Sequence, residues 1–203
     1  MDAAASCFAE RGYAATTLPQ IAARAGVSVE SVAANGPKRD LLLAAFEQTF
    51  GGREGSDPMS ERTEVSSLLD IPDRRAMVEA MADFIVAGQE RGAGIWRALS
   101  AAADHDDTVA ELYRGLAARR RQDHLLLVRA LAERGMLRNE RPLEEVADTL
   151  ALLDGFDPYQ LLVRDFGWPV DRLREWWMAM VERLVLRPED PDPGDRGAGR
   201  TTR

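Results

Sequence analysis

Several residue types are nearly absent from the 203-residue chain, which has one cysteine, two histidines and a single lysine. Because Cys7 is the only cysteine, an internal disulfide and a cysteine-rich zinc site are both excluded. No apolar run reaches the roughly 18 residues needed to span a bilayer. The first residues, Met1-Asp2-Ala3, lack the basic start and apolar block of a signal peptide. We therefore expect a cytoplasmic protein without a membrane partner.

The residue patterns of enzymes are also missing. The sequence has no Ser/His/Asp set in a suitable context, no glycine-rich phosphate loop after a strand and no His-x-x-x-His pair. The run Asp104-His105-Asp106-Asp107 has the residue types of a metal site, but it connects two predicted helices, where acidic caps are common. We expect no enzyme activity, no metal and no other cofactor.

Positive charge is scarce. The formal net charge of the chain is −8 at pH 7, whereas a DNA-binding protein needs a basic face. Residues 1–50 contain four basic and five acidic residues, a net charge of −1, and the remaining −7 belongs to residues 51–203. The acidity therefore lies mainly outside the N-terminal quarter, which is nearly neutral.

Helical patterns dominate the sequence, and no convincing strand with alternating apolar residues occurs. We predict an all-α fold, with Gly92 and Gly94 interrupting the chain between two of its helices. Besides two short helices between residues 17 and 35, the predicted helices cover about 3–11, 38–50, 72–89, 96–104, 108–134, 142–153 and 170–186.

Shifts in composition divide the chain into parts. A polar, glycine-rich stretch follows residue 50, and the end of the chain is rich in proline, glycine and aspartate. We predict an N-terminal helical unit at 1–50, a linker at 51–70, a larger helical unit at 71–187 and a disordered tail at 188–203.

A run of three arginines, Arg119-Arg120-Arg121, lies inside the longest predicted helix. Consecutive residues of a helix point in different directions, so the three side chains do not share one face. We expect a solvated surface here, and the alternative is contact with an anionic ligand or partner.

The most informative stretch is 17–35, which has the pattern of a helix-turn-helix. Thr17-Leu18-Pro19-Gln20 is a capping box with a proline in the first turn. Gly26 stands where a helix ends and the backbone needs a positive φ, and Ser28 caps the next helix. Apolar residues recur at helical spacing at Leu18, Ile21, Ala22 and Ala25. Val27 is predicted to be the apolar residue that plugs the turn. This geometry offers a short helix to a DNA major groove.

The order of residues resembles the TetR family of bacterial transcriptional repressors. The matching strings are Phe-Ala-Glu-Arg-Gly-Tyr-Ala-Ala-Thr-Thr at 8–17, Ile-Ala-Ala-Arg-Ala-Gly-Val-Ser at 21–28, and then Lys38 and Leu41-Leu42. The resemblance implies an all-helical homodimer in which a three-helix DNA-binding domain is joined by a fourth helix to a ligand-binding and dimerisation domain. It also implies that a small-molecule effector changes the spacing of the two recognition helices and releases palindromic operator DNA.

The sequence departs from the family pattern in three places. Ala33 stands where the family usually has an aromatic residue that contacts a phosphate. The loop Asn35-Gly36-Pro37-Lys38 is one residue shorter, and the chain starts without the usual basic arm, through an internal start codon or a true loss. Each departure weakens the expected grip on DNA. The alternative is therefore a dimeric small-molecule-binding or protein-interaction module whose DNA-binding head has degenerated.

The candidate residues for contact with double-stranded DNA lie in and beside the predicted recognition helix. They are Thr17, Ser28, Val29, Glu30, Ser31, Ala34, Asn35 and Lys38. Thr17 and Lys38 are expected at phosphates, although a plain helix cap and a solvated lysine are the alternatives. No arginine is available to read guanine, and with so few cations we expect the affinity for DNA to depend weakly on salt.

Two further groups follow from the resemblance. The ligand pocket is assigned to Met77, Met81, Phe84, Trp96, Leu99, Tyr113, Leu116 and His124, for which plain core packing is the alternative. The dimer interface is assigned to Leu143, Val146, Leu150, Leu173, Trp176, Trp177, Met180 and Leu184, for which packing within one subunit is the alternative. The sequence identifies neither the effector nor the operator.

Overall fold

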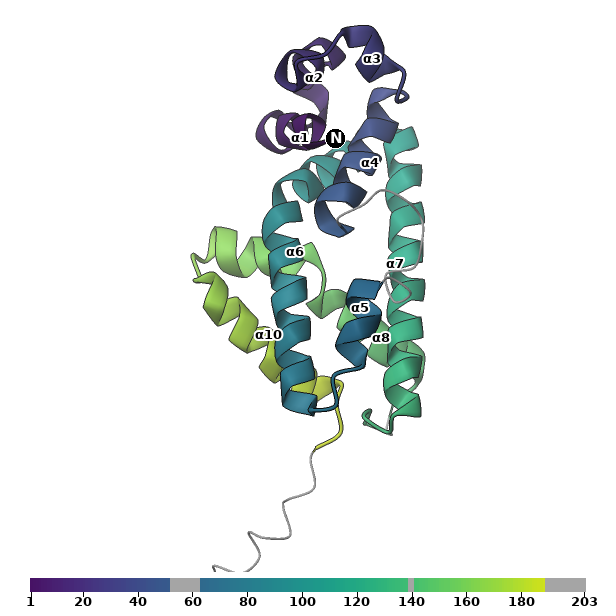
Figure 1. Ribbon diagram of the computed structural model, residues 1–203, viewed down its shortest axis with the longest axis vertical. Helices are drawn as coiled ribbons and strands as arrows, with labels where there is room; N and C mark the ends of the chain where they lie inside the picture. The colour runs from purple at the N-terminus through teal and green to yellow at the C-terminus, as the bar shows by residue number, and fades with distance from the viewer. Residues whose placement is uncertain (52–62, 139–140, 189–203) are drawn as a thin grey trace, which may run out of the picture.

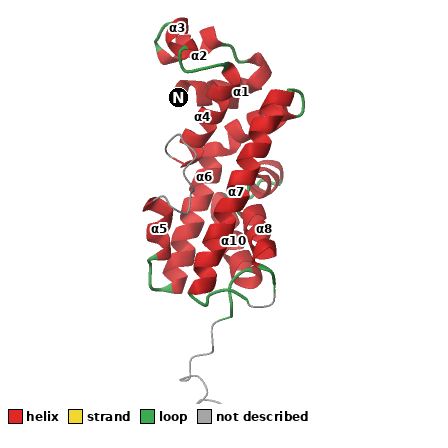
Figure 2. Ribbon diagram, turned by 90° about the vertical axis from the view of Figure 1, so that its right-hand side faces the viewer, coloured by secondary structure: helices red, strands yellow, loops and turns green. Residues whose placement is uncertain are grey.

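The computed structural model describes residues 1–51, 63–138 and 141–188. The chain forms an elongated bundle, with α1 to α3 at one end and the long helices α6 and α7 running along the bundle (Figures 1 and 2). The elements are α1 (Asp2–Ala15), α2 (Leu18–Ala25), α3 (Val29–Ala33), α4 (Lys38–Gly51), α5 (Thr63–Leu69), α6 (Arg74–Ala103), α7 (Asp107–Glu133), α8 (Leu143–Leu153), α9 (Phe156–Tyr159), η2 (Gln160–Asp165, a π-helix) and α10 (Val170–Leu184).

The all-α prediction is confirmed for the described residues, which contain a single isolated β-bridge, between Leu137 and Leu186, and no strand. Most of the predicted linker and residues 189–203 of the predicted tail lie outside the described residues. Within the predicted linker, α5 forms a short helix. None of the described helices is both long enough and apolar enough to cross a membrane.

The predicted helix-turn-helix forms through the local signals that the sequence carries. The Thr17 side chain accepts a hydrogen bond from the Gln20 backbone, and the Gln20 side chain accepts one from the Thr17 backbone, which completes the capping box. Gly26 ends α2 in the left-handed region with φ +69°, where a side chain would cause strain. Ser28 caps α3 by accepting from the Ser31 backbone. We call α1 to α3 the head.

Two predictions for the head have different outcomes. α1 was expected to end at Gly12, and the regular helix does break there, because Gly12 has φ +75° and ψ 171°, outside the helical region; helical residues then resume up to Ala15. Val27 was expected to plug the turn between α2 and α3, yet 49% of it is exposed, so that prediction is wrong. Ile21, Ala22 and Val32 provide the apolar contacts instead.

The predicted break at Gly92 and Gly94 is wrong, because α6 runs unbroken for 30 residues. These glycines serve close packing. A Cβ atom on Gly92 would lie 2.8 Å from the Phe156 ring, and one on Gly94 would lie 2.9 Å from the Cβ of Ala9. The favourable packing of these neighbours outweighs the low helix propensity of glycine, which costs about 1 kcal/mol per residue.

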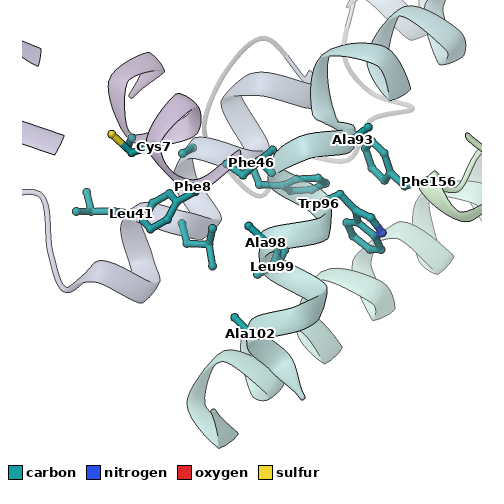
Figure 3. Packing of buried hydrophobic residues seen from close by; sticks show 14 of the residues in the cluster. Cys7, Phe8, Leu41, Phe46, Ala93, Trp96, Ala98, Leu99, Ala102 and Phe156 are labelled. Atoms are coloured by element: carbon teal, nitrogen blue, oxygen red, sulfur yellow. The ribbon is translucent and has the colours of Figure 1, made fainter. Parts of the chain in front are cut away.

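Two apolar clusters form the core. The first joins α1, α2 and α4 to the adjoining half of α6, and it includes the rings of Phe46, Trp96 and Phe156, which lie 5.0–5.6 Å apart (Figure 3). The second fills the far half of the bundle between α6, α7, α8 and α10. The head is therefore packed directly on α6, and its position depends on that helix.

Candidate functional site

Helix α3, which the sequence predicts to be the recognition helix, lies at the free end of the molecule (Figure 1). The DNA-binding hypothesis requires Val29, Ser31 and Asn35 to be uncovered, and all three are exposed, Val29 by 39%. Of the predicted DNA contacts, Thr17, Ser28, Glu30 and Ala34 are also exposed. The head thus offers a surface of small and mostly uncharged residues.

Several polar groups on this surface are engaged with the helix itself. The Asn35 side-chain nitrogen donates to the Ser31 carbonyl at 2.8 Å, and the hydroxyls of Ser28 and Ser31 lie 3.1 Å apart. Hydrogen bonds from the Glu30 backbone N–H and from Ser28 lower the pKa of the Glu30 carboxyl. Glu30 therefore stays ionised and adds a negative charge to the surface that would face DNA.

Two cations in and beside the head, one on α2 and one at the start of α4, are engaged as well. Arg24 donates both ends of its guanidinium to Glu10 at 2.6 and 2.7 Å. Lys38 was predicted to contact phosphate or to be solvated, but its Nζ donates to the carbonyls of Tyr13 at 2.9 Å and Thr16 at 3.1 Å. The ammonium also lies 4.2 Å from the centre of the Tyr13 ring. Lys38 thus fastens the start of α4 to the end of α1.

A cavity of about 80 Å³ lies between α6, α7, α8 and α10, and α5 and the end of α4 also line it. Four of the predicted pocket residues, Met77, Met81, Phe84 and His124, line this cavity. The other four do not line it. These four lie on the parts of α6 and α7 that are nearer the head, beyond the end of the cavity. The first core cluster buries Trp96, Leu99 and Leu116, and Tyr113 packs against it.

One wall of the cavity carries a buried polar group. The Asp154 carboxylate accepts from Trp177 Nε1 at 2.8 Å and from His124 Nε2 at 3.0 Å. His124 Nδ1 lies 2.7 Å from the Arg120 carbonyl, which can only accept. Both ring nitrogens of His124 thus face acceptors, which favours the doubly protonated, positive form. Burial lowers the His124 pKa, but the hydrogen bond and charge of Asp154 outweigh it, so the pKa is raised.

The three consecutive arginines separate, as the helix geometry predicted, but Arg120 is only partly exposed to solvent. Arg119 pairs with Glu47 and Arg121 pairs with Asp148, each at 2.6 Å. Arg120 is half-buried in the cavity wall, with its guanidinium carbon 5.4 Å from the Trp96 ring centre. Burial is the main effect on its pKa, which is lowered.

The predicted dimer residues fall into two sets. Val146, Leu150, Leu173 and Trp177 are at most 3% exposed and pack within the subunit, so their assignment to an interface between subunits is corrected. Leu143, Trp176, Met180 and Leu184 are half-buried. Sequence reasoning missed the exposed apolar residues Leu152, Leu161 and Phe166, which are 47–63% exposed on α8, on η2 and directly after η2.

Sequence reasoning also missed Asp154 and, as a cavity residue, Arg120. Asp154 follows the last residue of α8, where a carboxylate has no periodicity to reveal it. Within the acidic run at 104–107, Asp106 caps α7 by accepting hydrogen bonds from the backbone N–H groups of Thr108 and Val109. No group of His, Cys, Asp or Glu side chains suited to a metal ion is found in the described part of the chain.

Two family models match the sequence. The model of the bacterial regulatory proteins of the tetR family matches residues 1–35, and the model of the BetI-type transcriptional repressor C-terminal domain matches residues 73–186. No curated protein matches the sequence.

Solved structures match over nearly the full chain. A Saccharomonospora viridis protein described as a transcriptional regulator, in complex with choline, has a TM-score of 0.66 at 20% identity, covering 92% of this chain and 95% of that one. NalD of Pseudomonas aeruginosa, the secondary repressor of the MexAB-OprM multidrug efflux pump, has a TM-score of 0.65 at 21% identity, covering 92% of this chain and 94% of that one. The complex of triclosan with SmeT, a Stenotrophomonas maltophilia efflux-pump repressor, has a TM-score of 0.67 at 18% identity, covering 95% of this chain and 96% of that one. At these identities the likeness shows the fold alone.

Proposed function

The chain belongs to the TetR family of bacterial regulatory proteins, and we propose that it is a homodimeric, ligand-responsive repressor that binds palindromic operator DNA. The recognition helix of each subunit enters a major groove. A two-fold symmetric dimer places its two recognition helices about one turn of DNA apart, which matches a palindromic site.

One observation carries the link between ligand and DNA. Phe50, in the last turn of α4, lines the cavity and also packs on the rings of Phe46 and Phe156, at 6.1 and 5.5 Å. The other end of α4 is fastened to the head through Lys38. A ligand that displaces Phe50 therefore acts on the helix that holds the head.

The mechanism is a population shift. A ligand that binds better to a dimer with a different spacing of its heads lowers the affinity for DNA by its differential affinity for the two forms. The dimer forms through α8, η2 and α10, of which α10 contacts both of the others. These elements carry Leu152, Leu161 and the half-buried Trp176, and the exposed Phe166 follows directly after η2. Apolar area with aromatic residues is typical of such interfaces.

The head is tested with DNA from upstream of its own gene, at low salt, by gel shift. Ala34→Glu places a carboxylate at the C-terminal end of the recognition helix and should lower the affinity at least tenfold through repulsion of phosphate. Ala118→Glu, the same change at an exposed position of α7, should have no effect. Unchanged DNA binding by Ala34→Glu would overturn the assignment of α3.

Dimerisation is tested by sedimentation. Phe166→Glu should convert the dimer to a monomer, because an ionised carboxylate would be buried without a partner.

The affinity for DNA should depend only weakly on salt concentration, because the head has few cations. A salt slope as steep as that of about ten phosphate contacts would contradict this expectation.

A second function is favoured by the charges of the head. Glu30 is ionised on the surface that would face DNA, and Arg24 is paired with Glu10. A dimer that binds its ligand but does not shift its own upstream DNA at low salt would be a ligand-binding or protein-interaction module with a degenerate head.

A further inference from the structure

The cavity can discriminate among ligands by the charge of their polar group. Its wall is mainly apolar. The apolar lining from α6, α7 and α10 includes Met77, Met81, Ile85, Leu127, Leu131 and Val181. The lining on α7 runs from Arg120 to Leu131, a length of about 16 Å at the usual rise of a helix. This shape suits an extended apolar body with its polar group at the Arg120 end.

Arg120 is the charged group of the wall that has no ion-pair partner among the described residues. Its ring contacts are with Trp96 at 5.4 Å and Phe156 at 5.9 Å. Asp154, Asp157 and Asp123 act on its charge only through space. A guanidinium that is partly removed from water without a bound carboxylate can still make a bidentate pair with an anion.

The other charges of the wall are already engaged. Asp154 is 4% exposed, and its two oxygens accept from Trp177 and from His124, so the positive His124 and the negative Asp154 offset each other. Asp123 also lines the cavity, and it has an interaction of its own. A cationic ligand would therefore find no open carboxylate at Asp154 and would meet the positive Arg120.

We propose that the effector is an amphipathic carboxylic acid, an extended apolar molecule whose carboxylate pairs with Arg120. This inference rests on the proposed function, because it takes the cavity as the effector site. A free volume of about 80 Å³ is small for a ligand pocket, which typically holds 300–1,000 Å³. Binding must therefore move side chains, and the unbranched Met77 and Met81 are suited to do so.

Three probes with the same ten-carbon chain separate the charges: decanoate, 1-decanol and decyltrimethylammonium. Binding to the full chain is measured by calorimetry without DNA, so that failure of this inference is distinct from failure of the repressor function. We expect decanoate to bind at least tenfold more tightly than the alcohol and the cation. Tighter binding of either of these, or no binding of any probe, would overturn the proposal.

Variants test the role of Arg120 itself. Arg120→Met should weaken decanoate about 10- to 100-fold, as expected for a lost charge-assisted hydrogen bond, and should leave 1-decanol unchanged. Arg121→Met, at an exposed neighbour, is the matched control and should bind decanoate like the wild type. If Arg120→Met does not fold, Arg120→Lys keeps the charge and should retain decanoate over decyltrimethylammonium. Decanoate binding by folded Arg120→Met at wild-type affinity, or loss of that preference in Arg120→Lys, would refute the assignment.

Discussion

The head and the cavity end of the molecule satisfy their polar groups over very different sequence distances. In the head, Ser31 reaches Ser28 three residues away, and Arg24 reaches Glu10 fourteen residues away. In the cavity wall, Asp154 is reached by Trp177 and His124 from 23 and 30 residues away. At the residue after Asp154, the Gly155 carbonyl accepts from Gln89 across 66 residues.

Because of this difference, the loss of a polar contact should affect the structure of the two regions to different extents. A local contact in the head fixes one turn or one helix end, so its loss is confined. A long-range contact at the cavity holds several helices together, so its loss affects all of them. The cavity end is therefore expected to control the stability of the chain, while the head is expected to control its affinity for DNA.

The largest effect is expected at the aromatic cluster between these regions. Phe156 is 1% exposed and packs on Trp96 and Phe50, so Phe156→Ala should lower the free energy of unfolding by about 4 kcal/mol. Val27→Ala removes apolar atoms from the head, where the side chain is half-exposed, and should cost less than about 0.5 kcal/mol. Urea unfolding measures both, and equal losses would break the comparison.

Asp154 gives the next effect. Asp154→Ala leaves the Trp177 N–H and a charged His124 without their acceptor in a buried site, which should cost about 3 kcal/mol. Asp154→Asn keeps an acceptor oxygen and should cost less. Chemical unfolding at pH 6 measures the ranking, and a smaller loss for Asp154→Ala than for Asp154→Asn would show that the carboxylate does not organise this wall.

The same division decides what the sequence could predict. Thr17, Gly26 and Ser28 are local signals, and each was found where predicted. Gly92 obeys no local rule, because a ring 64 residues away in the sequence decides that it must be small. Arg120 could be placed on a helix but not on a face, since the helices that cover it come from distant parts of the chain.

The capping box tests the local end of the comparison. Thr17→Ala removes the side-chain acceptor of the Gln20 N–H and should cost about 1 kcal/mol. Thr17→Ser keeps an oxygen at this position and should restore most of the loss. Thermal unfolding measures both variants. A loss of stability for Thr17→Ala as large as that for Phe156→Ala would show that the effect of losing a contact in the head is not confined to one helix end.

The stability of the cavity end should depend on pH through His124. Its pKa is raised in the folded chain above the ordinary 6.5, so its stabilisation is fully present below pH 6.5 and is lost as the pH rises through the folded pKa. The free energy of unfolding of the wild type should therefore exceed that of His124→Gln by less and less as the pH rises from 6 to 8, as chemical unfolding of both chains would measure. A difference that grows over this interval would show that His124 is neutral in the folded chain.

Glu10→Gln is expected to have the smallest effect on stability. It is also the most direct test of how the charge of the head affects DNA binding. The Glu10–Arg24 pair is exposed, so its loss should hardly change the melting temperature. The freed Arg24 adds one cation to each of the two heads of the dimer, so the logarithmic salt slope of DNA binding should steepen by about 1.8. Glu79→Gln frees Arg75 in the same way on α6, beside the cavity, and should leave the slope unchanged. If both variants steepen the slope equally, DNA responds to the net charge of the whole chain, and the head loses its separate role.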